Sequence, residues 1–138
     1  MTGSPTVVLR RDTGPDLLSE VRQTFRSLWE SHSTIPEAVR AEVMLASGEV
    51  IANIIEHAAV DGPVDFTMEV TVLPDEIEVK LVDSGREFHL DLDAVTMPTE
   101  MAERGRGLAI ALALLKTLSY KRIGGLNHWT LRSGPFTE

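Results

Sequence analysis

Cysteine is absent from the 138 residues, which excludes disulfide bonds, thiolate metal sites and cysteine nucleophiles. Long hydrophobic runs are missing too. The longest, LAIALALL at residues 108–115, is too short for a membrane helix, which needs about 20 apolar residues. The N-terminal residues MTGSPTVVLRRD lack the basic-then-apolar order of a signal peptide. We therefore expect a soluble, cytoplasmic protein that has no membrane partner.

Basic residues are scarce. The chain has 13 lysines and arginines and 21 acidic residues, so the formal net charge is -8. Nucleic-acid surfaces are normally basic, so we expect no nucleic-acid partner, although a few local groups could still hold a small anionic ligand. The length suits one domain over residues 1–138, and a hydrophobic fraction of 43% allows a core.

The hydrophobic periodicity and the turn signals predict an alternation of strands, hairpins and a few helices. Strands joined by hairpins, with few enough helices for one face, predict an α+β two-layer sandwich. We expect strands at residues 6–11, 64–73 and 76–83, a final hairpin turning at Gly124-Gly125, and helices at about 16–30, 36–59 and 107–118.

An unusual polar stripe runs along the second predicted helix. Glu49, Asn53 and His57 recur every four residues, on the side away from a thick apolar face. An ordinary solvated stripe is one interpretation. However, no lysine or arginine pairs with its acids, and asparagine is a mediocre helix former. The stripe therefore favours a site where a cation arrives with the ligand, and oxygen ligands beside phosphates suit Mg²⁺.

The segment EIEVKLVDSG carries a carboxylate at the end of a strand. Alternation puts Asp83 on the same side as the apolar Ile77, Val79 and Leu81, and a buried carboxylate needs donors. Asp83 could close a turn with Ser84-Gly85. Alternatively, it accepts a hydrogen bond from a ligand amine, with Gly85 allowing close approach.

The segment ERGRGLAIALALLK places Gly105 and Gly107 directly before an apolar helix. A helix N-terminus offers unpaired N–H groups to phosphate, and Arg104 and Arg106 add positive charge. The glycines could equally form an ordinary loop hinge. The segment is neither a P-loop nor a dinucleotide-binding fingerprint.

Together the three segments resemble the ATP-binding domain of the GHKL superfamily, which includes gyrase, heat-shock chaperones, histidine kinases and mismatch-repair ATPases. GEVIANIIEHA resembles the N box, VDSGREF the G1 box and ERGRGLAIALALLK the G2 box. The likeness spans residues 6 to 133. It implies the Bergerat fold, a mixed, mostly antiparallel sheet with helices on one face. The small size and NIIEHA are similar to the bacterial anti-sigma factor serine kinases.

The resemblance also implies residue roles. The N-box acid orients or deprotonates the attacking hydroxyl, the N-box amide ligates Mg²⁺, the G1 aspartate reads the adenine amino group, and the G2 residues hold the phosphates. These roles match Glu49 for catalysis, Asn53 for the metal, Asp83 with Gly85 for adenine, and Arg104, Gly105, Arg106 and Gly107 for phosphate. Residues 90–106 would form a lid over the nucleotide.

Three further positions bear on the resemblance to the GHKL superfamily. His57 fits the family pattern, and we expect it to be structural. Glu87 replaces a commonly small residue, and His89 stands where an acid often follows. Both lie at the start of the expected lid, so they bear on lid geometry and nucleotide affinity.

The implied function is an ATP- and Mg²⁺-dependent protein serine kinase and anti-sigma factor, expected to be a homodimer. Its substrate would be a STAS-type anti-anti-sigma protein, which competes with a sigma factor for the kinase. Two alternatives remain: a nucleotide-sensing module that binds a partner other than sigma without phosphoryl transfer, and a purely structural interaction domain.

Overall fold

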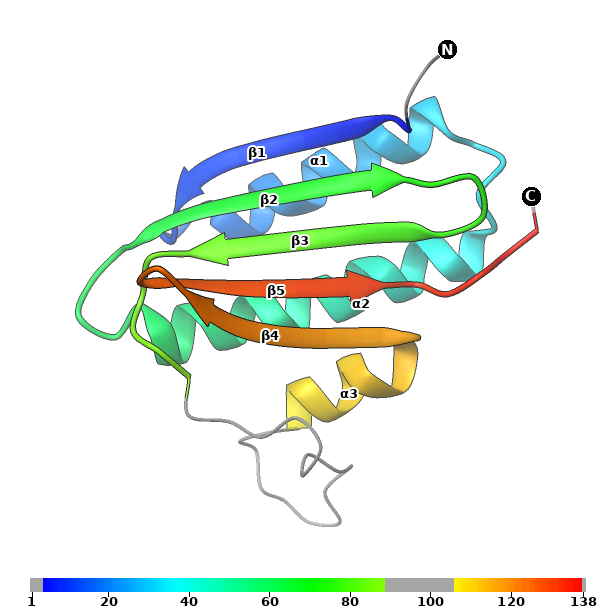
Figure 1. The fold of residues 1–138 in the computed structure, drawn as a ribbon. Helices are drawn as coiled ribbons and strands as arrows, with labels where there is room; N and C mark the ends of the chain where they lie inside the picture. Colours follow the sequence, from blue (N-terminus) through cyan, green and yellow to red (C-terminus); the bar gives the residue numbers. More distant parts are fainter. Residues whose placement is uncertain (1–3, 89–105, 138) are drawn as a thin grey trace.

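The computed structural model describes residues 4–88 and 106–137. A five-stranded sheet forms one layer and the helices cover one of its faces (Figure 1). The chain runs through β1 (Thr6–Asp12), α1 (Leu17–Ser31), α2 (Glu37–Asn53), a π-helical turn (Ile54–Ala58), β2 (Asp65–Val72), β3 (Ile77–Asp83), α3 (Arg106–Leu114), β4 (Thr117–Ile123) and β5 (Leu126–Arg132). Within the described ranges, no helix is long and apolar enough to cross a membrane.

The strand order is β1-β2-β3-β5-β4, and all four pairings are antiparallel. Pro74 and Asp75 turn the chain between β2 and β3, where the Leu73 N–H donates to the Glu76 carbonyl at 2.8 Å. At the second predicted hairpin, Gly124 and Gly125 have φ of +58° and +79°, as a type I′ hairpin turn requires of both central residues. The α+β architecture with helices on one face is confirmed.

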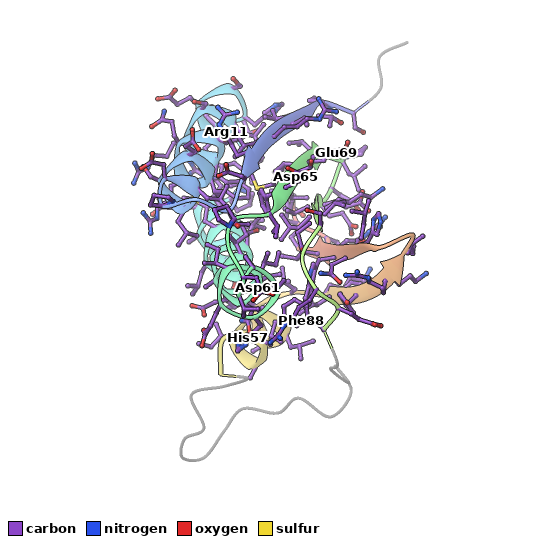
Figure 2. The ribbon with its side chains drawn as sticks, turned by 90° about the vertical axis from the view of Figure 1, so that its left-hand side faces the viewer. Arg11, His57, Asp61, Asp65, Glu69 and Phe88 are labelled. Carbon is purple, nitrogen blue, oxygen red and sulfur yellow. The ribbon has the colours of Figure 1, made fainter. Side chains whose placement is uncertain are left out.

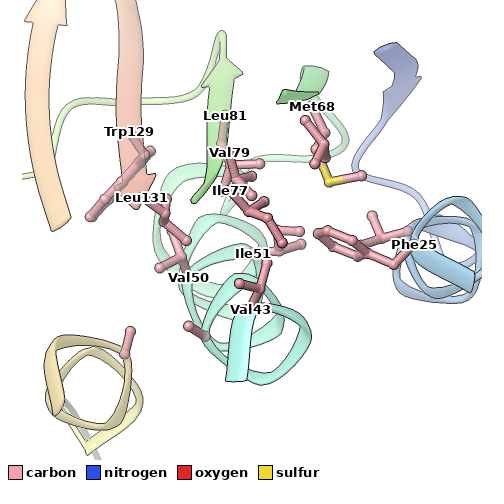
Figure 3. Packing of buried hydrophobic residues seen from close by; sticks show 14 of the residues in the cluster. Phe25, Val43, Val50, Ile51, Met68, Ile77, Val79, Leu81, Trp129 and Leu131 are labelled. Carbon is pink, nitrogen blue, oxygen red and sulfur yellow. The ribbon is translucent and has the colours of Figure 1, made fainter. Parts of the chain in front are cut away.

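The core lies between the inner face of the sheet and α2. Alternate residues of each central strand point inward and are buried, as period-two alternation requires. Figure 3 shows Val43, Val50 and Ile51 of α2 beneath Val79, Leu81 and Leu131 of the sheet. Since α2 also packs against α1 and α3, it is the central helix of its layer.

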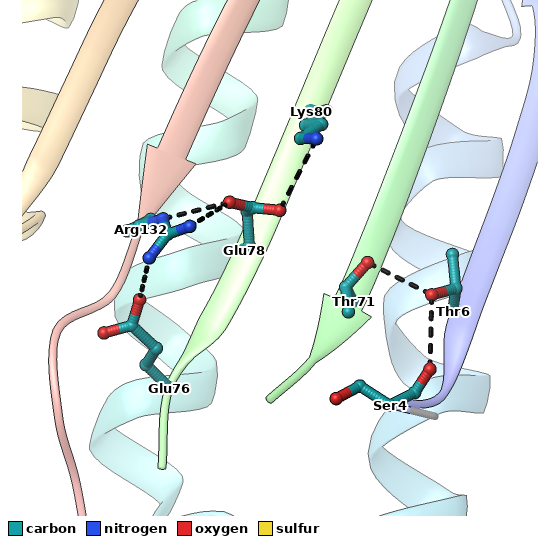
Figure 4. A network of polar contacts seen from close by, with 7 residues as sticks. All are labelled: Ser4, Thr6, Thr71, Glu76, Glu78, Lys80 and Arg132. Atoms are coloured by element: carbon teal, nitrogen blue, oxygen red, sulfur yellow. Dashed lines mark hydrogen bonds and ion pairs between the residues drawn. The ribbon is translucent and has the colours of Figure 1, made fainter. Parts of the chain in front are cut away.

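The opposite face of the sheet is polar. Arg132 bridges two acids there, with Nη1 3.0 Å from Glu76 Oε1 and Nη2 2.7 Å from Glu78 Oε2 (Figure 4). Lys80 lies 3.9 Å from the other oxygen of Glu78. The two acids are mostly covered, but the Arg132 side chain is 44% exposed, so solvent weakens these pairs. The hydrophobic inner face holds the two layers together.

The third predicted helix is four residues too long. It ends at Leu114, and the Lys116 N–H already donates to the Arg132 carbonyl at 3.0 Å. The tight turn at Gly124-Gly125 aligns the final hairpin, so β4 pairs with β5 from Ile123 back to Thr117. Pairing across the sheet therefore overrides the helical pattern of residues 115–118.

The second predicted helix does not continue as one α-helix to residue 59. It is α-helical to Asn53 and then widens into the π-helical turn, in which the Ala59 N–H donates to the Ile54 carbonyl at 3.0 Å. Single π-helical turns often occur at functional sites. Here the turn carries the backbone of His57 and Ala58 against the segment that follows β3.

Truncating a buried side chain of α2 tests this core. Ile51 is fully buried, whereas Leu45 on the same helix is 50% exposed. Ile51→Ala should lower the free energy of unfolding by about 2–5 kcal/mol because it leaves a cavity. Leu45→Ala should change it by less than about 0.5 kcal/mol. Urea unfolding of both variants measures the difference, and equal losses would contradict the packing of α2.

Candidate functional site

The carboxylate of Asp83 is buried at the C-terminal end of β3. It continues the inner-facing series Ile77, Val79 and Leu81 and is only 1% exposed. The inward orientation predicted from the alternation is therefore correct. The turn interpretation also has a basis, because Asp83 Oδ1 accepts the Gly85 N–H at 2.9 Å.

The two oxygens of this carboxylate differ sharply. Oδ1 accepts hydrogen bonds from Gly85 N and from Asn127 Nδ2, the latter at 2.8 Å. Oδ2 is buried and has no hydrogen-bond partner among the described residues. Because an unpaired buried acceptor is costly, this atom fits a ligand that brings an N–H donor.

Burial raises the pKa of Asp83 above the ordinary aspartate value of 3.8. The hydrogen bonds from Asn127 and Gly85 oppose this rise, as do the charges of Arg122 and His128. The protonated form is thus favoured by desolvation and the ionised form by its donors.

A second polar group forms where α2 meets the start of α3. A Cβ added at Gly107 would lie 2.6 Å from Glu49 Oε1 and 3.3 Å from Asn53 Nδ2. Glycine therefore lets the first turn of α3 lie against these side chains without displacing the end of Glu49. The N-terminus of α3 lies beside the acid and the amide of the predicted N box, and helix N-termini generally offer N–H groups to a ligand.

The two polar atoms of the Asn53 side chain differ in their hydrogen bonding. Its Nδ2 donates to the Glu49 carbonyl at 2.9 Å, and Oδ1 makes no hydrogen bond to a described residue. A carbonyl-type oxygen next to a carboxylate is the donor set that Mg²⁺ takes when phosphate oxygens and waters supply the rest. Residues 4–88 and 106–137 hold no cluster of three or more His, Asp or Glu side chains arranged for a metal, so a resident ion held by such side chains does not fit, whereas one that arrives with a phosphate ligand does.

Gly85 links the two polar groups through the backbone. A Cβ at this position would lie 2.5 Å from the carbonyl oxygen of Ala58. That same oxygen accepts the Arg86 N–H at 3.0 Å, and the His57 carbonyl accepts Arg86 Nε at 2.9 Å. The close approach expected at Gly85 therefore exists, but it is to the end of the π-helical turn.

His57 lies against Phe88 at the end of the molecule that faces the viewer in Figure 2, with ring centroids 6.3 Å apart. Its Nε2 is 3.8 Å from Glu56 Oε1. These contacts are packing contacts at the edge of the site.

Some predicted site residues fall outside the described chain. Arg104, Gly105 and His89 are among them, as is the expected lid up to residue 105. Arg106 is the first residue of α3. Glu87 is exposed.

The residue pattern did not single out three residues that contact the site: Tyr120, Arg122 and Asn127. Asn127 is fully buried and bonds Asp83 directly. A signal was present, because alternation along β5 puts Asn127 on the same face as Trp129 and Leu131. A polar residue at the inner end of an apolar strand is the pattern that pointed to Asp83.

The sequence matches the histidine kinase-like ATPase domain over residues 13–132, which is most of the chain. The chain belongs to this family. Membership in this GHKL family implies a site for ATP, and it agrees with the N-, G1- and G2-box segments.

Solved structures agree on the fold. The RsbU and RsbW domains of Rv1364c from Mycobacterium tuberculosis superpose with a TM-score of 0.63 at 19% identity, over 94% of this chain and 32% of that one. The histidine kinase domain of the blue-light-activated histidine kinase EL346 from Erythrobacter litoralis gives a TM-score of 0.53 at 18% identity, over 85% and 60%. The chain thus spans about a third of the first protein and somewhat under two thirds of the second. No curated protein is significantly similar in sequence.

The contact between Gly85 and Ala58 gives a stability prediction for this family member. Gly85→Ala should lower the free energy of unfolding by about 1–3 kcal/mol, because the new methyl group meets backbone that cannot rotate away. Gly48→Ala is the matched control, since a Cβ there has nothing within 4 Å. It should raise stability by about 0.5–1 kcal/mol, as for other helical glycines. Thermal and urea unfolding measure both, and a neutral Gly85→Ala would contradict the contact.

The raised pKa of Asp83 predicts a pH dependence. A carboxyl group whose pKa is higher in the folded state contributes stability below its unfolded pKa and loses it as pH rises through the folded pKa. Compared with Asp83→Asn, which cannot titrate, the wild type should therefore be relatively more stable near pH 3.5 than near pH 7. Unfolding in urea across this range measures the difference. A difference that does not change with pH would show that the pKa of Asp83 is unshifted.

Proposed function

We propose that the protein is an ATP-dependent protein serine kinase and anti-sigma factor that phosphorylates a STAS-type anti-anti-sigma protein. The unpartnered buried Oδ2 of Asp83 is the observation that carries the ATP-binding part. The 6-amino group of adenine is the N–H donor that this oxygen lacks. The serine specificity and the partners rest on the resemblance to anti-sigma factor kinases.

The phosphates would lie at the second polar group. The N-terminus of α3 supplies N–H groups and positive dipole, and Gly107 brings this end of the helix close to Glu49 and Asn53. Arg104, Gly105 and Arg106 precede or begin this helix in the sequence and would complete the phosphate site. Mg²⁺ bound with the triphosphate would neutralise its charge, with Asn53 Oδ1 as the protein ligand.

In the transfer step, the serine Oγ of the partner forms a bond to the γ-phosphorus, and the bond from that phosphorus to the β-phosphate bridging oxygen breaks. ADP leaves, and Glu49 accepts the serine proton. Such transfer depends mostly on positioning and electrostatic stabilisation. The helix N-terminus and the neighbouring arginines supply both.

A groove gives the partner a route to Glu49. It has a volume of about 430 Å³, lies between α1 and α2, and is lined by Leu18, Val21, Arg22, Phe25, Ala41, Met44, Leu45, Gly48 and Glu49. Most of this lining is apolar, and among the described residues Glu49 is the one acid in it. We expect the serine-bearing segment of a STAS protein to enter this groove and to bring its serine to Glu49.

In this pathway the unphosphorylated STAS protein competes with a sigma factor for the kinase. Phosphorylation releases the kinase to hold sigma. The protein acts as a cytoplasmic homodimer with a single domain over residues 1–138, and residues 90–106 form its nucleotide lid.

Transfer to a STAS-domain protein from the same genome tests the proposal. The wild type with ATP and Mg²⁺ should phosphorylate one serine, and a substrate with that serine changed to alanine is the control. Glu49→Gln should bind ATP like the wild type but transfer phosphate about 10²–10⁴-fold more slowly, because it cannot accept the proton. Phosphate-affinity electrophoresis and calorimetry measure the two properties.

Three outcomes would reject parts of this scheme. Binding of ATP without transfer to any STAS protein of that genome would favour the nucleotide-sensing module. Full activity of Glu49→Gln would remove Glu49 from catalysis. No ATP binding at all would leave only a structural interaction domain.

A further inference from the structure

The side chain of Asn127 is fully buried and uses every hydrogen-bonding position that it has. An amide offers two donors and two acceptor positions. Its Nδ2 donates to Asp83 Oδ1 at 2.8 Å and to the Arg86 carbonyl at 2.9 Å. Its Oδ1 accepts from Tyr120 Oη at 2.5 Å and from Arg122 Nη1 at 3.0 Å. Fully satisfied buried networks of this kind define one arrangement of their members.

The neighbours of Asn127 determine which way its amide points. Arg122 can only donate, so the amide oxygen must face Arg122 and the amide nitrogen must face Asp83. Strand pairing brings the three together, because Asn127 on β5 lies opposite Asp83 on β3 and opposite Arg122 on β4.

This orientation decides which oxygen of Asp83 is free. Oδ1 is occupied by Gly85 N and Asn127 Nδ2, and only Oδ2 is left without a donor. If Asn127 did not donate, the carboxylate would have one anchor fewer, and either oxygen could rotate toward the ligand.

The same side chains also hold the chain as it leaves β3. Asn127 holds the Arg86 carbonyl, Arg122 Nη1 donates to the Gly85 carbonyl at 2.7 Å, and the Phe88 N–H donates to Tyr120 Oη at 3.0 Å. Three backbone groups between Gly85 and Phe88, beside the proposed adenine-reading acid, are therefore bonded to side chains of β4 and β5.

We infer that Asn127 is a positioning residue for adenine recognition, held in register by Tyr120 and Arg122. It touches Asp83 and not the base, and it directs Oδ2 of Asp83 at the 6-amino group. The inference rests on the proposed function in that ATP is the ligand and Asp83 its reader. The inference assigns to Asn127, Tyr120 and Arg122, together with Asp83, the preference for a purine that carries a 6-amino group.

The test compares ATP with purine riboside 5′-triphosphate, which is ATP without the 6-amino group. Wild type should prefer ATP. In Asn127→Ala the ratio of the two affinities should fall about tenfold, since a hydrogen bond to a charged group is lost, while affinity for the analogue changes much less. Isothermal titration calorimetry measures both. A change that only damaged the fold would weaken both nucleotides alike.

Tyr120→Phe keeps the test decisive if Asn127→Ala fails to fold. It retains the ring that packs on Phe88 and Trp129 and removes only the hydroxyl. The affinity ratio should fall about threefold, as for loss of a neutral hydrogen bond. Thr130→Ala on the open face of β5 is the matched control, and its ratio should equal that of the wild type.

Asp83→Asn separates this inference from the proposed function. If Asp83→Asn lowers the ratio but Asn127→Ala and Tyr120→Phe do not, the positioning role is rejected while adenine reading by Asp83 stands. Equal loss of both nucleotides in the Asn127 variant rejects it too. If Asp83→Asn leaves the ratio unchanged, both ideas fail. ATP binding without phosphoryl transfer rejects only the kinase, and the ratios still decide the role of Asn127.

Discussion

The hydrogen bond from Asn127 to the buried carboxylate of Asp83 is the interaction on which the proposed adenine site depends. It joins two strands that are adjacent in space but 44 residues apart in sequence. A carboxylate with no donor would not stay ionised in such a place. The two donors on Oδ1 offset part of the cost of burying this carboxylate. They leave Oδ2 without a partner among the described residues, so a ligand with an N–H group can bind there.

The second constraint is that α2 must serve the core and the site at once. Its broad apolar face is buried by the sheet and by α1, and Glu49 and Asn53 turn toward the start of α3. The π-helical turn then carries the same chain against Gly85. The helix and its π-helical turn thereby connect the proposed phosphate-binding end of the site with its proposed adenine-binding end. A shift of α2 along its axis would disturb the core and both ends of the site together, because Gly107 lies close to Glu49 and Gly85 lies against the Ala58 backbone.

Local patterns were sufficient for most elements and for the inward position of Asp83. The alternation in β3 placed Asp83 inward, and the paired glycines located the final hairpin. Patterns failed where distant pairing competed with local preference. The pattern of residues 115–118 predicts a helix, yet Thr117 and Leu118 pair with β5 and belong to the sheet. The π-helical turn was also missed, because nothing local distinguishes it from the α-helix that it continues. Asn127 showed a usable signal, but no partner for it could be named without the strand order.

The sequence by itself determined the class of fold, the absence of thiol chemistry, and the three segments that mark a histidine kinase-like ATPase domain, because each depends on residue type and short-range spacing. Only the tertiary structure decided which oxygen of Asp83 is free, that Gly85 meets Ala58, that Gly107 meets Glu49, and that Tyr120, Arg122 and Asn127 form one network. These contacts join residues many positions apart. Their geometry depends on strand register and helix packing, which arise from the whole core at once and which no short stretch of sequence encodes.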